Sequence, residues 1–165
     1  PFFHGLKPPS ITIRAYLERI MTYSPCSVEC FVLALVYVDR IMQANWRFVL
    51  TSLNVHRLLL TAVMTGVKYH DDCSYNNAYY AKVGGIPLGE LNALEVELLF
   101  LLGFDLHVSG EVFERYYSEL MKHAPIALGQ VTTSSPGLPS VTTITSASPT
   151  TTSRLQRHPH PEAAC

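Results

Sequence analysis

Residues 54–69 read Asn54-Val55-His56-Arg57-Leu58-Leu59-Leu60-Thr61-Ala62-Val63-Met64-Thr65-Gly66-Val67-Lys68-Tyr69. From Leu58 to Val67, apolar or small residues cover nearly every face that a helix would present. A helix that is apolar on all sides belongs in the interior of a protein. The run is too short to span a bilayer, which needs about 20 apolar residues. We therefore predict a buried central helix that delivers one charged residue, Lys68, to its rim.

Size, charge and cysteine content limit the function classes that suit this chain. Its 165 residues are 48% hydrophobic, which is enough for one globular domain with a core. The formal net charge of −1 predicts neither a nucleic-acid partner nor an anionic membrane surface. The four cysteines lack the spacing of a zinc site. A reduced intracellular protein without metal or cofactor is the simplest interpretation.

The composition changes sharply near His123. Residues 124–165 contain fourteen Ser or Thr and six Pro, but only three charged residues. Such a segment buries too little apolar surface to offset its ordering entropy, so we expect a disordered tail. Residues 1–9 are expected to be extended, because Pro8 and Pro9 disfavour helix there. The folded part is therefore residues 1–123, with an extended segment over residues 1–9 and a helical domain over residues 10–123.

The folded part is predicted to be all-α, because helical spacing of apolar residues recurs and no convincing strand alternation appears. Pro87 opens a helix that extends to Leu102, and the pair Gly84-Gly85 ends the preceding short one. We expect these helices to pack around the central one. The expected N-cap residues are Ser10, Ser27, Asn54, Asn76 and Ser109.

The sequence contains no convincing catalytic or metal-binding motif. It has no phosphate-binding glycine loop, no H-E-x-x-H and no nucleophile elbow. His70-Asp71-Asp72-Cys73 places ligand types side by side, but adjacent residues of a helix point in different directions. We interpret that run as a polar helix exit. His158 and His160 of the tail make a poor metal site, so neither catalysis nor metal binding is expected.

Three charged residues lie within otherwise apolar helical segments: Arg14, Asp39 and Lys68. Buried charges persist mainly when they are paired. A buried Arg14–Asp39 pair with Lys68 nearby would satisfy this requirement. Alternatively, each charge sits at a helix rim and reaches water through its own side chain. Spacing alone does not separate these two hypotheses.

Several segments, in the right order, resemble the cyclin box. Ile13-Arg14-Ala15-Tyr16-Leu17 resembles its M-R-A-I-L segment, Tyr37-Val38-Asp39-Arg40-Ile41 its Y-I-D-R-F, and Gly66-Val67-Lys68-Tyr69-His70-Asp71 its A-S-K-F-E-E. Four further segments are similar to the single-box cyclins called PHO-type in fungi and P- or U-type in plants and protists. These are Phe3-His4-Gly5, residues 16–20, residues 77–86 and residues 90–95. The resemblance covers roughly residues 2–120.

The resemblance implies an all-α cyclin box, with five helices packed around a buried central helix and flanking helices. It also implies a regulatory subunit, not an enzyme, that binds and activates a cyclin-dependent protein kinase in cell-cycle or nutrient-signalling control. The expected location is the nucleus, the cytoplasm or both. In the family, one lysine and one glutamate hold the end of the kinase's PSTAIRE-type helix, and by motif these are Lys68 and Glu95. The family's buried charge pair maps to Arg14 and Asp39.

One departure concerns substrate recruitment. Cell-cycle cyclins carry a tryptophan where Ile20 stands, within a patch that binds substrate motifs. Ile13, Tyr16, Leu17 and Ile20 either form an apolar docking groove or make ordinary core contacts.

Two other functions compete with kinase activation. The first is a cyclin-fold adaptor that binds another protein without activating a kinase, and the second is a metal-dependent enzyme. An adaptor of the DNA- or peptide-binding kind would need a basic face or paired repeats, and the sequence shows neither.

Overall fold

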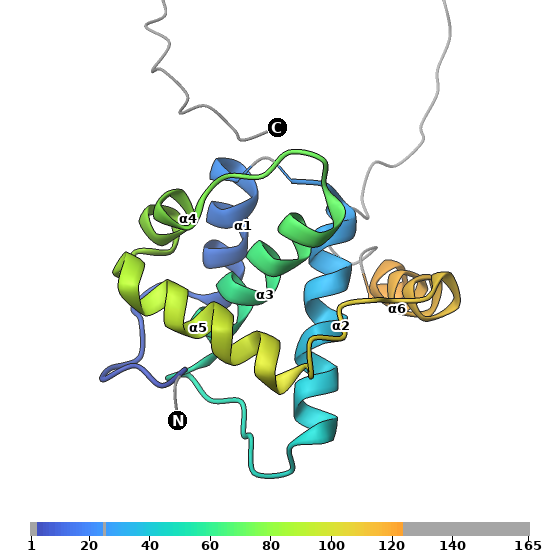
Figure 1. Ribbon diagram of the computed structural model, residues 1–165, viewed down its shortest axis with the longest axis horizontal. Helices are drawn as coiled ribbons and strands as arrows, with labels where there is room; N and C mark the ends of the chain where they lie inside the picture. The colour runs from blue at the N-terminus through green and yellow to red at the C-terminus, as the bar shows by residue number, and fades with distance from the viewer. Residues whose placement is uncertain (1–2, 25, 124–165) are drawn as a thin grey trace, which may run out of the picture.

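A computed structural model describes residues 3–24 and 26–123 of the chain. Within these ranges the regular elements are six helices, with no strand, which confirms the all-α prediction (Figure 1). The helices are α1 (Ile13–Tyr23), α2 (Val28–Ala44), α3 (Val55–His70), α4 (Asn77–Gly84), α5 (Leu88–Leu101) and α6 (Gly110–His123). None of the described helices combines the length and the hydropathy needed to cross a bilayer.

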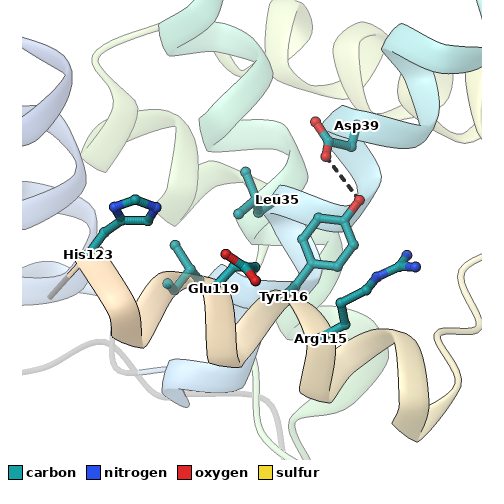
Figure 2. Close-up of a pocket in the computed structure, with 7 residues that line it drawn as sticks. Leu35, Asp39, Arg115, Tyr116, Glu119 and His123 are labelled. Carbon is teal, nitrogen blue, oxygen red and sulfur yellow. Dashed lines mark hydrogen bonds between the residues drawn. The ribbon is translucent and has the colours of Figure 1, made fainter.

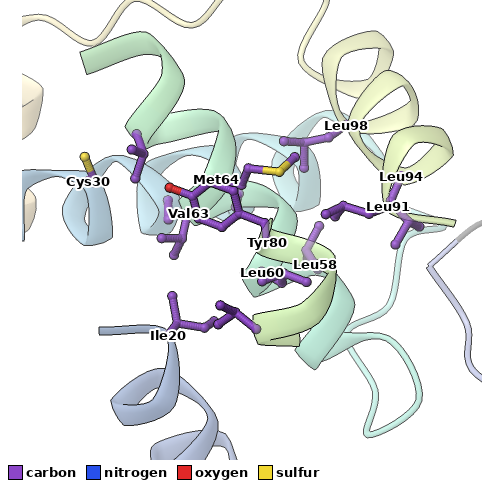
Figure 3. Close-up of a cluster of buried hydrophobic side chains, with 14 of the residues drawn as sticks. Ile20, Cys30, Leu58, Leu60, Val63, Met64, Tyr80, Leu91, Leu94 and Leu98 are labelled. Carbon is purple, nitrogen blue, oxygen red and sulfur yellow. The ribbon is translucent and has the colours of Figure 1, made fainter. Parts of the chain in front are cut away.

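Helix α3 is the centre of the fold. Eleven of its sixteen residues are buried, and it contacts α1, α2, α4 and α5 (Figure 1). The neighbouring helices contribute large side chains to the core around it, as Figure 3 shows for Ile20, Tyr80, Leu91, Leu94 and Leu98. The prediction of a buried central helix is confirmed.

Gly66 allows α3 to lie close against α2. A Cβ atom added at this position would meet the carbonyl oxygen of Cys30 at 3.1 Å and the Cβ of Leu33 at 3.6 Å. A glycine inside a helix costs about 1 kcal/mol relative to alanine. Here the missing side chain gives close contact between the two longest helices of the fold.

The helix termini follow the sequence only in part. Asn76 caps α4 as predicted, accepting a hydrogen bond from the amide of Tyr79 at 3.0 Å, and Gly85 ends α4 in the left-handed conformation with φ of 70°. The predicted cap Ser10 is wrong, because α1 begins at Ile13 and the side chain of Thr12 caps it.

Ser27 and Asn54 occupy N-cap positions, but their side chains bond elsewhere. Asn54 braces the preceding loop, where its Oδ1 accepts from the Thr51 amide at 2.7 Å and its Nδ2 donates to the Val49 carbonyl at 2.8 Å. Neither side chain accepts a hydrogen bond from a backbone amide in the first turn of its own helix.

The segment before α1 packs onto the helices. Phe3 is 1% exposed, and its ring meets that of Phe48 edge-on with 6.1 Å between centroids. The amide of Gly5 donates to the carbonyl of Leu53 at 2.8 Å. Residues 3–9 contain neither helix nor strand. The expected disordered tail, residues 124–165, lies outside the described residues.

Helix α6 flanks the others and packs against α2 (Figure 1). None of its residues is fully buried. Its start is bonded as expected, since the amide of Val112 donates to Oγ of Ser109 at 3.4 Å.

Candidate functional site

The structure brings Lys68 and Glu95 together at the surface. Lys68 lies in the last turn of α3 and Glu95 in the middle of α5, and the Nζ–Oε1 distance is 2.6 Å. Asn77, the first residue of α4, joins them: its Oδ1 accepts from Lys68, and its Nδ2 donates to Oε2 of Glu95 at 2.7 Å. The same Nδ2 lies 2.8 Å from Oδ1 of Asn92. Three helices therefore hold one polar cluster.

This cluster is accessible to solvent, and its internal hydrogen bonds fix its geometry. The side chains of Lys68 and Glu95 are 32% and 20% exposed. An ammonium has three donors and a carboxylate has about four lone-pair sites, so both groups retain hydrogen-bonding capacity beyond the contacts described. The cluster can bind a further polar partner without losing its internal bonds.

Exposed apolar side chains adjoin the cluster in sequence and along α5. Tyr69 follows Lys68, and Val96 and Phe100 lie four residues apart on the outer side of α5. The rings of Phe100 and Phe104 meet edge-on, with 5.1 Å between their centroids. These four side chains are each between 49% and 65% exposed. Large apolar residues exposed on the element that carries a polar cluster indicate a candidate protein-binding surface.

Sequence reasoning identified Lys68 and Glu95 but missed Asn77 and the apolar residues of α5. Asn77 lies inside one of the family-like segments, and it was overlooked because its neighbour Asn76 accounted for the helix cap. The signal for the α5 face was the four-residue spacing of Val96 and Phe100 beside charged residues.

The predicted buried Arg14–Asp39 pair is wrong. Figure 2 shows that Asp39 faces α6, where its Oδ2 accepts a hydrogen bond from the Tyr116 hydroxyl at 2.9 Å. Arg14 is exposed on α1 and has no ion pair among the described residues. It lies near Phe31, eight residues before Asp39 in α2, or about 12 Å along the helix axis. The rim alternative is therefore correct for Arg14.

The space beside the Asp39–Tyr116 contact is a cavity of about 470 Å³ between α2 and α6. Both acidic and basic side chains line it, so it has no clear preference for the charge of a ligand (Figure 2). The acidic lining residues are Asp39 and Glu119, and the basic ones are Arg115 and His123.

Ile13, Tyr16, Leu17 and Ile20 do not form one apolar groove together. Tyr16 and Ile20 are buried in the core, at 4% and 0% exposure. Ile13 and Leu17, on another side of α1, line a shallow groove with Met21 and Phe31. Core contact is therefore the correct interpretation for half of the predicted set.

A second ion pair joins α3 and α5. Nε of Arg57, in the first turn of α3, lies 2.5 Å from Oε1 of Glu90, in the first turn of α5. The sequence interpretation did not identify this pair, because the two residues are 33 positions apart and belong to no motif that predicts ion pairing.

A polar link between α2 and α3 involves Asp71, which accepts from the Ser27 hydroxyl at 2.6 Å and from the Ser27 amide at 3.0 Å. Partial burial acts to raise the pKa of Asp71, but these hydrogen bonds outweigh it and hold the pKa below its ordinary value. Burial also raises the pKa of the free thiols Cys26 and Cys30, to about 11 and about 12. Neither thiol is therefore an activated nucleophile.

The described residues contain no cluster of three or more potential metal ligands. Comparison with known proteins gives the family. The sequence profile of the Cyclin family matches residues 1–106. The chain belongs to the cyclin family.

Plant cyclins of the U and P types are similar to this cyclin. Cyclin-U4-1 of Arabidopsis thaliana is 54% identical over 120 residues, which are 73% of this chain and 59% of the relative. Cyclin-U1-1 of the same plant is 52% identical over 120 residues, 73% of this chain and 57% of the relative. Cyclin-P4-1 of Oryza sativa subsp. japonica is 49% identical over 118 residues, 72% of this chain and 56% of the relative. The resemblance to P/U-type cyclins is confirmed, and this chain spans less than two-thirds of each relative's length.

Proposed function

We propose that this cyclin binds and activates a cyclin-dependent protein kinase by docking on its PSTAIRE-type helix. The observation that carries the proposal is the Lys68–Glu95 pair, because it occupies the positions of the family's kinase-binding residues and lies at the surface beside exposed apolar side chains. The complex would act in the nucleus, the cytoplasm or both.

The polar cluster suits the end of a helix. Helix ends carry unsatisfied carbonyl and N–H groups. The Lys68 ammonium can donate to carbonyls and the Glu95 carboxylate can accept from N–H groups, and both would be charge-assisted hydrogen bonds. Asn77 holds the two side chains in place before docking. Such preorganisation reduces the entropy lost on binding.

The apolar residues supply the contact area around this polar centre. Fully burying one large apolar side chain contributes about 1.5–3 kcal/mol. Tyr69, Val96, Phe100 and Phe104 offer four such side chains.

Activation follows if the docked helix has the position required by the active kinase. A ligand shifts a conformational equilibrium only through its differential affinity for the two states. The phosphoryl-transfer groups belong to the kinase, including the Lys–Glu ion pair whose glutamate lies on the docked helix. This cyclin would position the kinase helix and would supply no catalytic group.

The first test is the double variant Lys68→Ala/Glu95→Ala in a pull-down of cyclin-dependent kinase from the source cells. We expect kinase capture to fall by at least tenfold. The matched control is Glu119→Ala/Lys122→Ala, which removes an ion pair of the same composition from α6 and should leave capture unchanged. Full capture by a folded Lys68→Ala/Glu95→Ala protein would contradict the assigned site.

A polarity swap separates docking from simple stabilisation of the fold. Lys68→Glu/Glu95→Lys keeps an ion pair between α3 and α5 but exchanges the donor and the acceptor. We expect a melting temperature near that of the wild type together with loss of kinase capture. Retained capture would show that the pair only joins the two helices. Capture without stimulation of phosphate transfer would favour the adaptor function instead.

A further inference from the structure

A second cavity lies at the opposite end of α3 from Lys68. The segment before α1, α1 itself, the first turn of α3 and the turn between α4 and α5 enclose about 380 Å³. Ligand pockets generally have volumes of about 300–1,000 Å³. Arg57 lies eleven residues before Lys68, so the cavity is about 16 Å from the proposed kinase site along the helix axis.

The lining of this cavity is positively charged. Lys7, Arg19 and Arg57 contribute to its wall, and no aspartate or glutamate lines it. The Glu90 carboxylate engages Nε of Arg57, which leaves the two terminal nitrogens of that guanidinium as donors. Lys7 and Arg19 are exposed and make no ion pair among the described residues.

Two of these cations act on one point inside the cavity, the Tyr16 hydroxyl. This hydroxyl donates to the Gly84 carbonyl at 3.2 Å. Burial raises the pKa of Tyr16 to about 12, while the charges of Arg19 and Arg57 oppose that rise. The two guanidiniums therefore direct positive potential to the same wall of the cavity.

His56 adds a buried polar group without a partner. It is 8% exposed, lines the cavity and bonds through Nε2 to the Ile11 carbonyl at 2.9 Å. A carbonyl only accepts, so Nε2 is the donor of that bond. Nδ1 has no hydrogen-bond partner within residues 3–24 and 26–123. With Nε2 donating, Nδ1 of the neutral ring is an acceptor, so the group that it can receive from a ligand is a donor such as the P–OH of a protonated phosphate.

From these observations we infer that the cavity binds a phosphate group. Lys7 and Arg19 carry positive charges that no described ion pair offsets, and these charges attract a multiply charged anion. The fork of a guanidinium matches phosphate oxygens with two parallel hydrogen bonds. The ligand is either free inorganic phosphate or a phosphorylated side chain, which share this chemistry.

The test is calorimetric titration of the full chain at low ionic strength. The probes are inorganic phosphate, a short phosphoserine peptide and the same peptide without phosphate. We expect saturable binding of at least one phosphate-bearing probe and none of the unmodified peptide. Tighter binding of the phosphopeptide identifies a phosphorylated side chain as the ligand, and tighter binding of inorganic phosphate identifies the free ion.

Arg19→Gln and Arg14→Gln form a matched pair, since both remove an exposed arginine from α1 but only Arg19 lines the cavity. Arg19→Gln should weaken phosphate binding by about tenfold, which corresponds to about 1.4 kcal/mol. Arg14→Gln should change it less than twofold. Lys7→Gln, which lies outside the helices, is a second variant that should also weaken phosphate binding.

Two results would overturn the inference. One is the absence of saturable binding by both phosphate-bearing probes. The other is equal weakening by Arg19→Gln and Arg14→Gln, which would indicate non-specific attraction to net charge. Kinase capture depends on the other end of α3, so the two proposals are tested independently. Absence of phosphate binding would not contradict the proposed kinase site, and loss of kinase capture would not contradict phosphate binding in the cavity.

Discussion

Asp71 joins two helices through a single carboxylate. It is the C-cap residue of α3, and its hydrogen bonds come from the hydroxyl and the amide of Ser27, the N-cap residue of α2. The Ser27 hydroxyl also lies 3.2 Å from Sγ of Cys30. A position that normally bonds its own helix therefore bonds the end of a neighbour.

Ser27→Ala should lower the free energy of unfolding by about 1 kcal/mol at neutral pH, because it removes one bond to a partly exposed charged group. The Asp71 pKa is depressed in the folded protein, so its stabilising contribution is present above its ordinary value of 3.8 and is lost as the pH falls through the folded pKa. The difference between wild type and variant should therefore shrink below about pH 4. Urea unfolding between pH 3 and pH 7 measures it.

The matched control for this experiment is Asp72→Asn, which removes the neighbouring exposed carboxylate. It should leave the free energy of unfolding nearly constant at neutral pH. A Ser27→Ala difference that stays the same at every pH would show that the hydroxyl acts through Cys30 or packing and not through Asp71.

How well individual residue contacts could be predicted depended on whether a family motif or helical spacing supported the prediction. Lys68 and Glu95 came from a resemblance in which the partner position is implied by motif, and the structure brings them together. The Arg14–Asp39 pair was a hypothesis from charges within apolar helices that the resemblance then favoured, but Asp39 bonds to Tyr116 of α6. Helical spacing within one segment does not reveal which distant residue competes for a carboxylate.

Helix α6 is the least buried element among the described helices. Its apolar side consists of Phe113, Tyr116, Tyr117 and Leu120, and of these Tyr117 and Leu120 remain 39% and 41% exposed. Hydrogen bonds anchor the segment that leads into it. Tyr37 donates to the Leu106 carbonyl at 3.0 Å, and Arg40 donates to two further carbonyls of residues 105–107. Three hydrogen bonds from α2 therefore hold residues 105–107, the segment before α6, in place.

Backbone amides of α6 should exchange with deuterium faster than those of α3, because local opening of α6 exposes little apolar surface. Tyr116→Phe should accelerate exchange in α6 further by removing the bond to Asp39, while exchange in α3 stays unchanged. Hydrogen–deuterium exchange followed by mass spectrometry resolves the two helices. Equal protection of α3 and α6 in the wild type would show that α6 opens only with the whole domain.

The sequence predicted the order of the helices correctly, but it predicted only some of the hydrogen bonds at their ends. Asn76 and Gly85 both act on residues within a few positions of themselves, so local rules sufficed. Ser27 and Asn54 were correctly placed at helix starts, yet their side chains reach Asp71 and a loop. The hydrogen bonds of a cap residue that makes tertiary contacts can be predicted only when the neighbouring segments are known.

For the molecule as a whole, the folded unit begins before its first helix. Phe3 fills the core beside Phe48, within the segment that the sequence interpretation expected to be extended and placed before the helical domain. Two prolines correctly indicated the absence of helix, but they do not reveal whether an extended segment is packed. Burial of a single aromatic side chain decides that question.

Phe3→Ala should lower the free energy of unfolding by about 3 kcal/mol or more, because it removes a buried aromatic ring and leaves a cavity. Leu6→Ala is the matched control in the same segment, since Leu6 is fully exposed and its truncation should have no measurable effect. Thermal or denaturant unfolding compares the two variants. Equal stability of both would show that the segment before α1 does not contribute to the domain.

The burial of α3 also affects how genetic screens of this cyclin should be interpreted. Substitutions at most positions between Val55 and Val67 will reduce the amount of folded protein, so their phenotypes will report abundance. At Lys68 and Tyr69, where the helix reaches the surface, an allele can lose function while the protein accumulates normally. Measuring protein level beside phenotype, residue by residue along α3, would therefore separate alleles that impair folding from alleles that impair recognition.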